Sequence, residues 1–500
     1  INRILSEIRS TYSGLISLVV GLLSIVVGTV FTLILTRTLN PLEYGTWGLI
    51  SGLTNYAIII HAIVSYWAYR ESARNIDSGK TAITSSAILS VIGIIVYLIL
   101  ISQIGPQSDA NSNDLFFGLL LIPIMIFYYV INFINLGWKP HVASYGLLTI
   151  GIIQIPSALF LIYYLDMGVS GIILTVFISY FVGTVTQSIF ARNKLKNKFN
   201  KEFLLKWTKL SWIPIYPTIG MLITRLDIMV FTLITGSVVG LAFWVAAITI
   251  TSPIANAGLL TRPVYAKLLR GEESIHLQKN ITYVFYFLLP FTALAITFSK
   301  PALFALNPVY QFAFIIVAML SVRVLLTTLN GIFEESLVGA EKIDTYKNSK
   351  FKDYVKSKLF LIPTLRIIQS ALFVITLIIG FFYLINESTI DQLTFWAILS
   401  VLTQIPFSIY LYILVKKNLV IVLEKNSILK YFVVSIGVFT LMYFLLEKFL
   451  IYHSSIYNFL PNFLLFLGLG IGSYLLLTYL IDSKIRELFA AIINELKKII

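Results

Sequence analysis

Long apolar segments recur from one end of the chain to the other, separated by short polar connections. Each segment is about 20 residues long, the length a helix needs to cross ~30 Å of hydrocarbon. Lipid offers no partner to backbone polar groups, so a spanning segment is a helix or a barrel strand, and these segments are too long and too evenly apolar for strands. The pattern predicts fourteen spans, at residues 14–36, 44–68, 82–104, 115–135, 142–165, 169–190, 210–234, 238–260, 281–299, 309–335, 359–385, 392–415, 430–449 and 459–481.

The positions of lysine and arginine test this count. If the N-terminus is cytoplasmic, alternate connections are cytoplasmic too and should be enriched in cations. Those segments hold 31 of the 37 lysines and arginines, the outer connections hold three, and three lie inside spans. A missed or added span would invert every later connection. The bias therefore favours fourteen spans with both termini cytoplasmic, and it explains the net charge of +14 without a nucleic-acid partner.

Composition agrees with an all-α integral membrane protein of the cell membrane. Hydrophobic residues make up 58% of the chain and charged residues only 12%, against about 25% charged in soluble domains. There is no cysteine, and the four histidines are scattered, so no metal site and no cofactor is expected. The connections are too short for a soluble catalytic or ATPase domain, which favours a protein that is not an enzyme.

Two parts of the chain match each other. Residues 152–154 and 157–160 of the fifth span read IIQ and SALF, and residues 367–373 of the eleventh read IIQSALF. Tyr44-Gly45 likewise matches Val239-Gly240. These matches indicate a parallel repeat of six spans, an arrangement in which transporters enclose a site between two lobes.

The predicted organisation follows from this repeat. It comprises a cytoplasmic interfacial segment (1–13), an N-lobe (14–190), a basic cytoplasmic linker (191–209), a C-lobe (210–415), two further spans (430–481) and an amphipathic cytoplasmic helix (482–500).

Several motifs resemble one membrane protein family. The first hairpin reads TRTLNPLEYG over residues 36–45, with Asn40 where the family has glycine, and the second span ends YWAYRESAR over residues 66–74. The later motif residues are Tyr216-Pro217, Arg225-Leu226-Asp227, Gly236, Val239-Gly240, Pro263 and Ala266. Their order and spacing resemble the polysaccharide-transporter, or O-antigen flippase, family of the multidrug/oligosaccharidyl-lipid/polysaccharide superfamily. Beyond residue 270 the resemblance rests on hydropathy and span count.

The resemblance implies a fold of fourteen helices, with two six-helix lobes around a central cavity and two extra helices. It also implies a flippase whose cargo is a polyprenyl- or dolichyl-(pyro)phosphate-linked glycan, moved from the cytoplasmic to the outer leaflet by alternating access. The partners expected on this basis are the lipid-linked glycan and membrane lipids. Enzymes of glycan assembly or transfer are further candidate partners.

Charged residues inside spans are the candidate functional groups. A charge at bilayer depth costs roughly 2.5–3.5 kcal/mol on insertion scales, so it usually faces a cavity or a partner. Arg225, Arg323 and Arg366 are the three mid-span arginines, and their planar donor groups suit phosphate oxygens. We expect them to line the cavity; the alternative is a structural pairing with acids or helix ends. Asp227 and His61 are candidates for coupling or for a structural role.

Glutamines within the spans have two interpretations. Gln154 and Gln369 would contact sugar hydroxyls of the cargo, or they would join neighbouring helices by hydrogen bonds.

Two other functions remain open at the sequence level. A cation-coupled multidrug or small-solute antiporter of the same superfamily would have fewer spans and acidic intramembrane sites, whereas the charged spans here are mainly cationic. A membrane-integral glycan polymerase or ligase would carry a large outer loop with catalytic residues, and the outer connections here are short.

Overall fold

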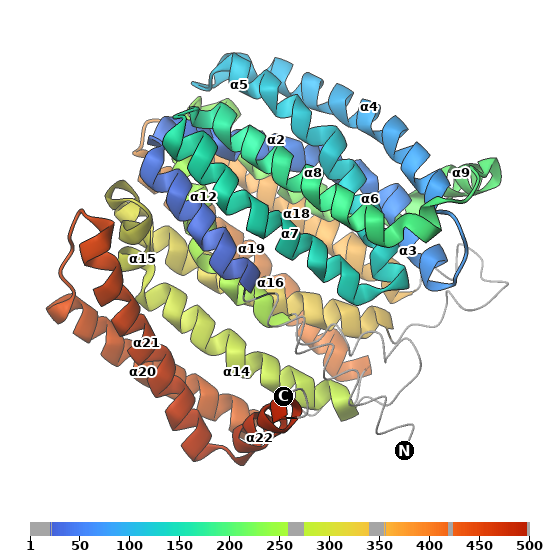
Figure 1. Ribbon diagram of the computed structural model, residues 1–500. Coiled ribbons are helices and arrows are strands. Elements are labelled where there is room, and N and C mark those ends of the chain that lie inside the picture. Colours follow the sequence, from blue (N-terminus) through green and yellow to red (C-terminus); the bar gives the residue numbers. More distant parts are fainter. Residues whose placement is uncertain are drawn as a thin grey trace. The chain divides into compact units, whose positions relative to one another are not determined.

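Every regular element in the described part of the chain is a helix. The computed structural model describes residues 21, 23–258, 275–339, 355, 357–418 and 424–497 (Figure 1). The fold class predicted from sequence, an all-α membrane protein, is confirmed. The predicted segment 1–13 and the motif residues Pro263 and Ala266 lie outside the described residues.

Backbone contacts divide the chain into two compact units. Unit 2 comprises Leu23–Val245 and Pro363–Trp396, and unit 1 comprises the remainder, including Ala246–Ile362 and Ala397–Ile500. This partition differs from the predicted lobes, whose boundaries remain a prediction.

The helices of the first half begin with Leu23–Thr38. They continue with α2 (Pro41–Ile58), η1 (Ile59–His61), α3 (Ala62–Ala73), α4 (Gly79–Ile104), η2 (Gly105–Gln107), α5 (Ser112–Phe117), η3 (Gly118–Leu120), α6 (Leu121–Trp138), α7 (Pro140–Ala158), η4 (Leu159–Tyr164), α8 (Gly168–Leu195) and α9 (Lys201–Lys209).

The second half begins with α10 (Trp212–Thr224), α11 (Leu226–Thr235) and α12 (Val239–Asn256). It continues with α14 (Ile275–Thr297), α15 (Ser299–Leu306), η6 (Pro308–Ala313), α16 (Phe314–Gly339), α18 (Lys358–Tyr383), α19 (Thr389–Asn418), α20 (Lys425–Phe449), α21 (Ile456–Ile481) and α22 (Ser483–Lys497).

The described residues of the fourteen predicted spans lie mostly in helices. Among the described residues, twelve helices are long and apolar enough to cross a membrane, one bent pair would make a thirteenth, and Leu23–Thr38 is a shorter apolar helix. The predicted ninth span, 281–299, ends where the chain turns by 67° between Thr297 and Ser299, and α15 follows in the predicted outer connection. Pro301 explains the break, since it has no amide hydrogen to donate to the carbonyl of Thr297.

The start of α2 shows how local sequence places a helix. The side chain of Asn40 accepts a hydrogen bond from the amide of Glu43, and the Glu43 carboxylate accepts one from the amide of Asn40, both at 3.0 Å. This capping box, followed by Pro41, fixes the beginning of the helix. Asn40, where the resembling family has glycine, therefore serves as the N-cap of α2.

The two hairpins that match in sequence touch each other in unit 2. A Cβ atom at Gly45 would overlap the carbonyl oxygen of Val238, and one at Gly240 would overlap the ring of Phe231. Phe231 in turn packs on Trp396, and Trp396 stacks on Trp244 with ring centroids 3.8 Å apart. The matched glycines therefore mark close helix contacts, as small residues do in membrane bundles.

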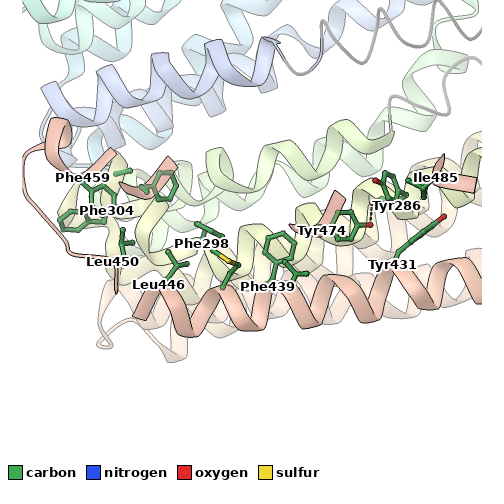
Figure 2. Close-up of a cluster of buried hydrophobic side chains, with 14 residues drawn as sticks. Tyr286, Phe298, Phe304, Tyr431, Phe439, Leu446, Leu450, Phe459, Tyr474 and Ile485 are labelled. Atoms are coloured by element: carbon green, nitrogen blue, oxygen red, sulfur yellow. Dashed lines mark hydrogen bonds between the residues drawn. The ribbon is translucent and has the colours of Figure 1, made fainter. Parts of the chain in front are cut away.

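The last two spans pack against α14 through an aromatic core in unit 1. Figure 2 shows this cluster. Tyr286 of α14 and Phe298, the residue that follows α14, belong to it. The other helices contribute Tyr431 and Phe439 of α20 and Tyr474 of α21. The Tyr474 hydroxyl donates to the backbone oxygen of Tyr286 at 2.8 Å. These contacts attach α20 and α21 to the rest of unit 1.

Asp482 joins α21 to α22, and its carboxylate makes the stability of this helix junction depend on pH. Burial acts to raise the pKa of Asp482, but the amide of Lys484 and the hydroxyl of Tyr431, with the charge of Lys430 nearby, lower it below its ordinary value. A carboxylate with a lowered pKa stabilises the folded state above the pKa of the unfolded chain, and this contribution is lost as the pH falls through the folded pKa.

We therefore expect Asp482→Asn to lower the unfolding temperature of the detergent-solubilised protein at pH 7. The difference from the wild type should shrink as the pH falls below about 4, because the wild-type carboxylate is then protonated. Thermal unfolding followed by circular dichroism at several pH values measures this. A pH-independent difference would show that the charge of Asp482 contributes nothing.

Candidate functional site

Two helix interruptions inside unit 2 carry polar side chains. The span Pro41–Ala73 is interrupted by the 3₁₀ turn η1, which ends at His61. The span Trp212–Thr235 is interrupted at Arg225, the fourteenth of its 24 residues, where α10 ends and α11 begins. Interruptions of this kind within a helix often mark functional positions.

An aromatic group from α6 and α8 lies beside the first interruption. The His61 ring stacks on Tyr129, with centroids 4.7 Å apart and planes inclined by 11°. The His61 Nδ1 atom lies 2.9 Å from the Ser65 hydroxyl, which fixes the orientation of the imidazole. Tyr180 of α8 follows, with its ring centroid 6.4 Å from that of Tyr129. All except the buried Ser65 are half-buried.

Arg225 belongs to the same neighbourhood. Helix α10 packs on α3, which begins directly after His61. Arg225 lies near Tyr129 and Asp227, and it is half-buried. We call His61, Ser65, Tyr129, Tyr180 and Arg225 the mid-span cluster.

Asp227 lies two residues after Arg225 and is almost fully enclosed. Its side chain is 7% exposed, and its Oδ1 atom accepts a hydrogen bond from the amide of Ile228 at 2.8 Å. It stands in the first turn of α11, where the positive end of the helix favours a carboxylate. This geometry accounts for a structural role of Asp227, and the coupling role remains a prediction.

Arg366 lies on α18, which runs along α10. The two helices are joined by hydrogen bonds between Tyr216 and Thr364 at 2.5 Å and from Thr224 to Ser370 at 2.8 Å. Between these bonds, a Cβ at Gly220 would lie 2.8 Å from the Cγ atom of Arg366. The stem of Arg366 therefore packs against α10 about one turn before Arg225.

The other predicted residues lie elsewhere. Arg323 is half-buried on α16, within unit 1. Gln154 on α7 and Gln369 on α18 are half-buried in unit 2. Unit 2 thus contains Arg225, Arg366, Asp227, His61 and both glutamines, and of these His61 and Arg225 belong to the mid-span cluster.

The chemistry of the mid-span cluster is that of an anion site with an aromatic wall. Guanidinium stays charged at any physiological pH and offers paired donors to phosphate oxygens. Tyrosine and histidine rings offer large apolar faces together with polar edges. Such a set has the chemistry to contact a phosphorylated group and a ring-shaped neighbour at once.

Sequence reasoning missed Tyr129 and Tyr180. A signal was present, because tyrosine is enriched at membrane–water interfaces, yet Tyr129 is the eighteenth of the 27 residues of its span, Ser112–Trp138. A tyrosine at that depth needs a polar neighbour, and the structure places His61 and Tyr180 beside Tyr129.

No family model and no curated protein matches the chain. Solved structures do match its fold. An inward-facing multidrug resistance MATE family transporter of the MOP superfamily matches with a TM-score of 0.57 and 14% identity, over 81% of this chain and 98% of that one. An outward-facing transporter of the same description matches with a TM-score of 0.53 and 18% identity, over 80% of this chain and 93% of that one.

A structure of the lipid II flippase MurJ, in an inward closed conformation, matches with a TM-score of 0.57 and 12% identity. This match covers 94% of the present chain and 99% of MurJ. At such identities the likeness establishes the fold alone, which this chain shares with these transporter structures.

Proposed function

We propose that the protein is a flippase that moves a polyprenyl- or dolichyl-(pyro)phosphate-linked oligosaccharide from the cytoplasmic to the outer leaflet of the cell membrane by alternating access. The observation that carries this proposal is the position of Arg225, a permanent cation at a mid-span helix interruption beside an aromatic wall. A cation at this depth is costly, and such residues usually face a cavity or a partner.

The cargo explains the residue types of the mid-span cluster. A (pyro)phosphate headgroup loses water when it enters the protein, and a guanidinium replaces part of that hydration by charge-assisted hydrogen bonds. The Tyr129 and His61 faces are suited to the sugar rings next to the phosphate, while the lipid tail stays in the bilayer. Arg323 and Arg366 are retained in the proposal as further cations of the path, and Gln154 and Gln369 as sugar contacts.

The extent of the structural matches also favours a lipid-linked cargo. The MurJ structure covers 94% of this chain and the MATE structure 81%, a difference of about 65 of the 500 residues. That is the length of two spans with their connection. The chain therefore resembles the lipid flippase over more of its length than it resembles the multidrug transporter.

Multidrug antiport is the second candidate, because Asp227 is a buried acid within a span and MATE transporters share the fold. Transport of a lipophilic cation would use this carboxylate, whereas transport of an anionic headgroup would use Arg225. The two functions therefore predict opposite cargo charges.

Proteoliposomes distinguish the two functions. The purified protein is reconstituted with a fluorescent polyprenyl-pyrophosphate disaccharide, and the fraction exposed to an added membrane-impermeant glycosidase is followed with time. In parallel, vesicles loaded with a lipophilic cationic dye are tested for efflux under a proton or sodium gradient. We expect glycolipid translocation without dye efflux; dye efflux without glycolipid translocation would overturn the proposal.

A further inference from the structure

The segment between α8 and α10 lies on one membrane face by its connections. α8 has 28 residues and ends at Leu195, and the next span begins at Trp212. The intervening residues 196–211 therefore emerge from the bilayer and return to it on the same side, which is cytoplasmic in the predicted topology. They contain one short helix, α9.

One side of α9 is fixed to α3 and α4, its neighbours within unit 2. Trp207 is 1% exposed, and its indole nitrogen donates to the carboxylate of Glu71 at 3.2 Å. Lys206 pairs with the same carboxylate at 3.4 Å and lies over the ring of Trp67. Asn200 caps the helix and donates its own amide to the hydroxyl of Thr81.

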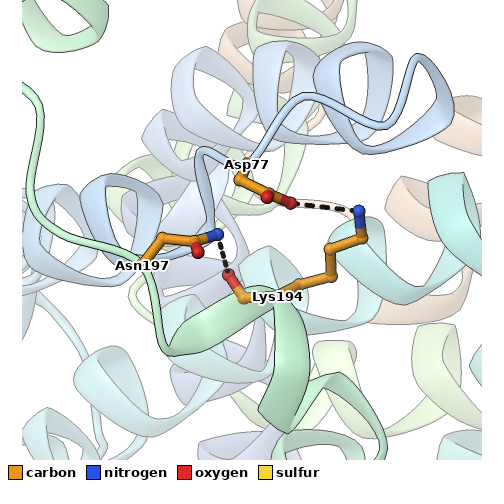
Figure 3. Close-up of polar contacts among 3 residues, drawn as sticks. All are labelled: Asp77, Lys194 and Asn197. Carbon is orange, nitrogen blue, oxygen red and sulfur yellow. Dashed lines mark hydrogen bonds and ion pairs between the residues drawn. The ribbon is translucent and has the colours of Figure 1, made fainter.

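The end of α8 is fixed in a similar way. Figure 3 shows Lys194 paired with Asp77 at 3.1 Å while Asn197 donates to the Lys194 carbonyl. Lys194 and Lys206 are thus committed to acids of unit 2, and the segment is held as a structured element rather than a loose loop.

The rest of this segment is exposed, cationic and partly apolar. Besides Lys206, five cations between residues 192 and 209 are exposed, and Glu202 is the only acid in this range of the sequence. These cations are Arg192, Lys196, Lys198, Lys201 and Lys209. Large apolar side chains are exposed beside them: Phe199 at 45%, Leu205 at 58% and Trp212 at 44%.

We propose that the α9 segment, residues 192–212, is a binding surface for anionic phospholipids of the leaflet on which it lies. Its lysines bind the phosphate headgroups, and Leu205, Phe199 and Trp212 enter the boundary between headgroups and acyl chains. Charge complementarity supports this occupant, since a basic segment next to a span attracts anionic lipid strongly and within about 10 Å. An apolar flank adjoining a basic face is the usual composition of an interfacial helix.

This surface is independent of the cargo, because none of its residues belongs to the mid-span cluster. Bound headgroups hold α9 from one side and Glu71 holds it from the other. The lipid composition of the leaflet therefore affects the segment that joins the two halves of the chain.

Spin-labelled lipids in reconstituted vesicles test the proposal. The wild type and the variant Lys198→Gln, Lys201→Gln, Lys209→Gln are compared for their association with labelled phosphatidylglycerol and phosphatidylcholine. We expect the variant to lose at least half of the preference for phosphatidylglycerol. The matched control is Lys416→Gln, Lys417→Gln, Lys425→Gln, which removes the same charge from exposed positions of α19 and α20 and should retain most of the preference.

Equal losses in both variants, or no loss in either, would overturn the proposal. A second measurement uses the absence of cysteine from the chain. A fluorophore attached to Leu205→Cys should be quenched by spin-labelled acyl chains in vesicles containing phosphatidylglycerol, and should become water-exposed in the triple lysine variant. A label that is water-exposed in both proteins would also refute the proposal that this segment binds lipid.

Discussion

Replacing Arg225 by alanine is expected to slow glycolipid translocation by about a hundredfold without loss of folded protein. Two hydrogen bonds between a charged donor and a phosphate contribute about 1.5 kcal/mol each at the lower end of the usual range, and a barrier raised by about 3 kcal/mol corresponds to that factor. The measurement is the initial rate of translocation in proteoliposomes, with circular dichroism as the check on folding.

Arg225→Lys is the matched control. It keeps the charge but loses the paired donor geometry, so we expect an intermediate rate. If Arg225→Ala translocates the glycolipid at the wild-type rate, the mid-span cluster is not the headgroup site. Loss of both folding and transport would instead assign Arg225 to the structure of the α10–α11 junction.

The replacement Gly45→Ala is expected to destabilise unit 2 by about 3 kcal/mol, the upper end of the range for overpacking. The added methyl group would meet the backbone carbonyl of Val238, and a backbone atom cannot move aside as the end of a flexible side chain can. Either α2 or the start of α12 must shift, and the packing of the matched hairpins is then lost. Unfolding of the purified protein in a denaturing detergent measures the change.

Gly28→Ala provides the comparison in the same unit. Gly28 lies in the helix Leu23–Thr38, and a Cβ there meets no atom within 4 Å. Alanine favours helix over glycine by about 1 kcal/mol, so this variant should be as stable as the wild type or more stable. Equal stabilities for Gly28→Ala and Gly45→Ala would contradict the close contact at Val238.

The helix interruptions illustrate the limit of hydropathy. Arg225 and His61 stood out in the sequence as polar residues within apolar spans. Nothing in that pattern indicated that both would occupy helix interruptions, or that the ring of Tyr129 would stack on His61 and lie near Arg225. Hydropathy ended the ninth span at residue 299, and only the structure showed that the chain continues there as the bent helix α15.

The sequence by itself determined the class of protein, the positions of the spans and the residues that deserve attention as intramembrane charges. Each span is recognisable because its insertion depends on its own twenty or so residues and on no other part of the chain. Only the tertiary structure decided that Gly45 meets Val238, that Arg366 packs against Gly220, and that His61, Tyr129 and Arg225 share one neighbourhood. The physical reason is that lipid and protein interior are equally apolar, so hydropathy carries no information about which face of a helix turns inward, and close packing alone selects it.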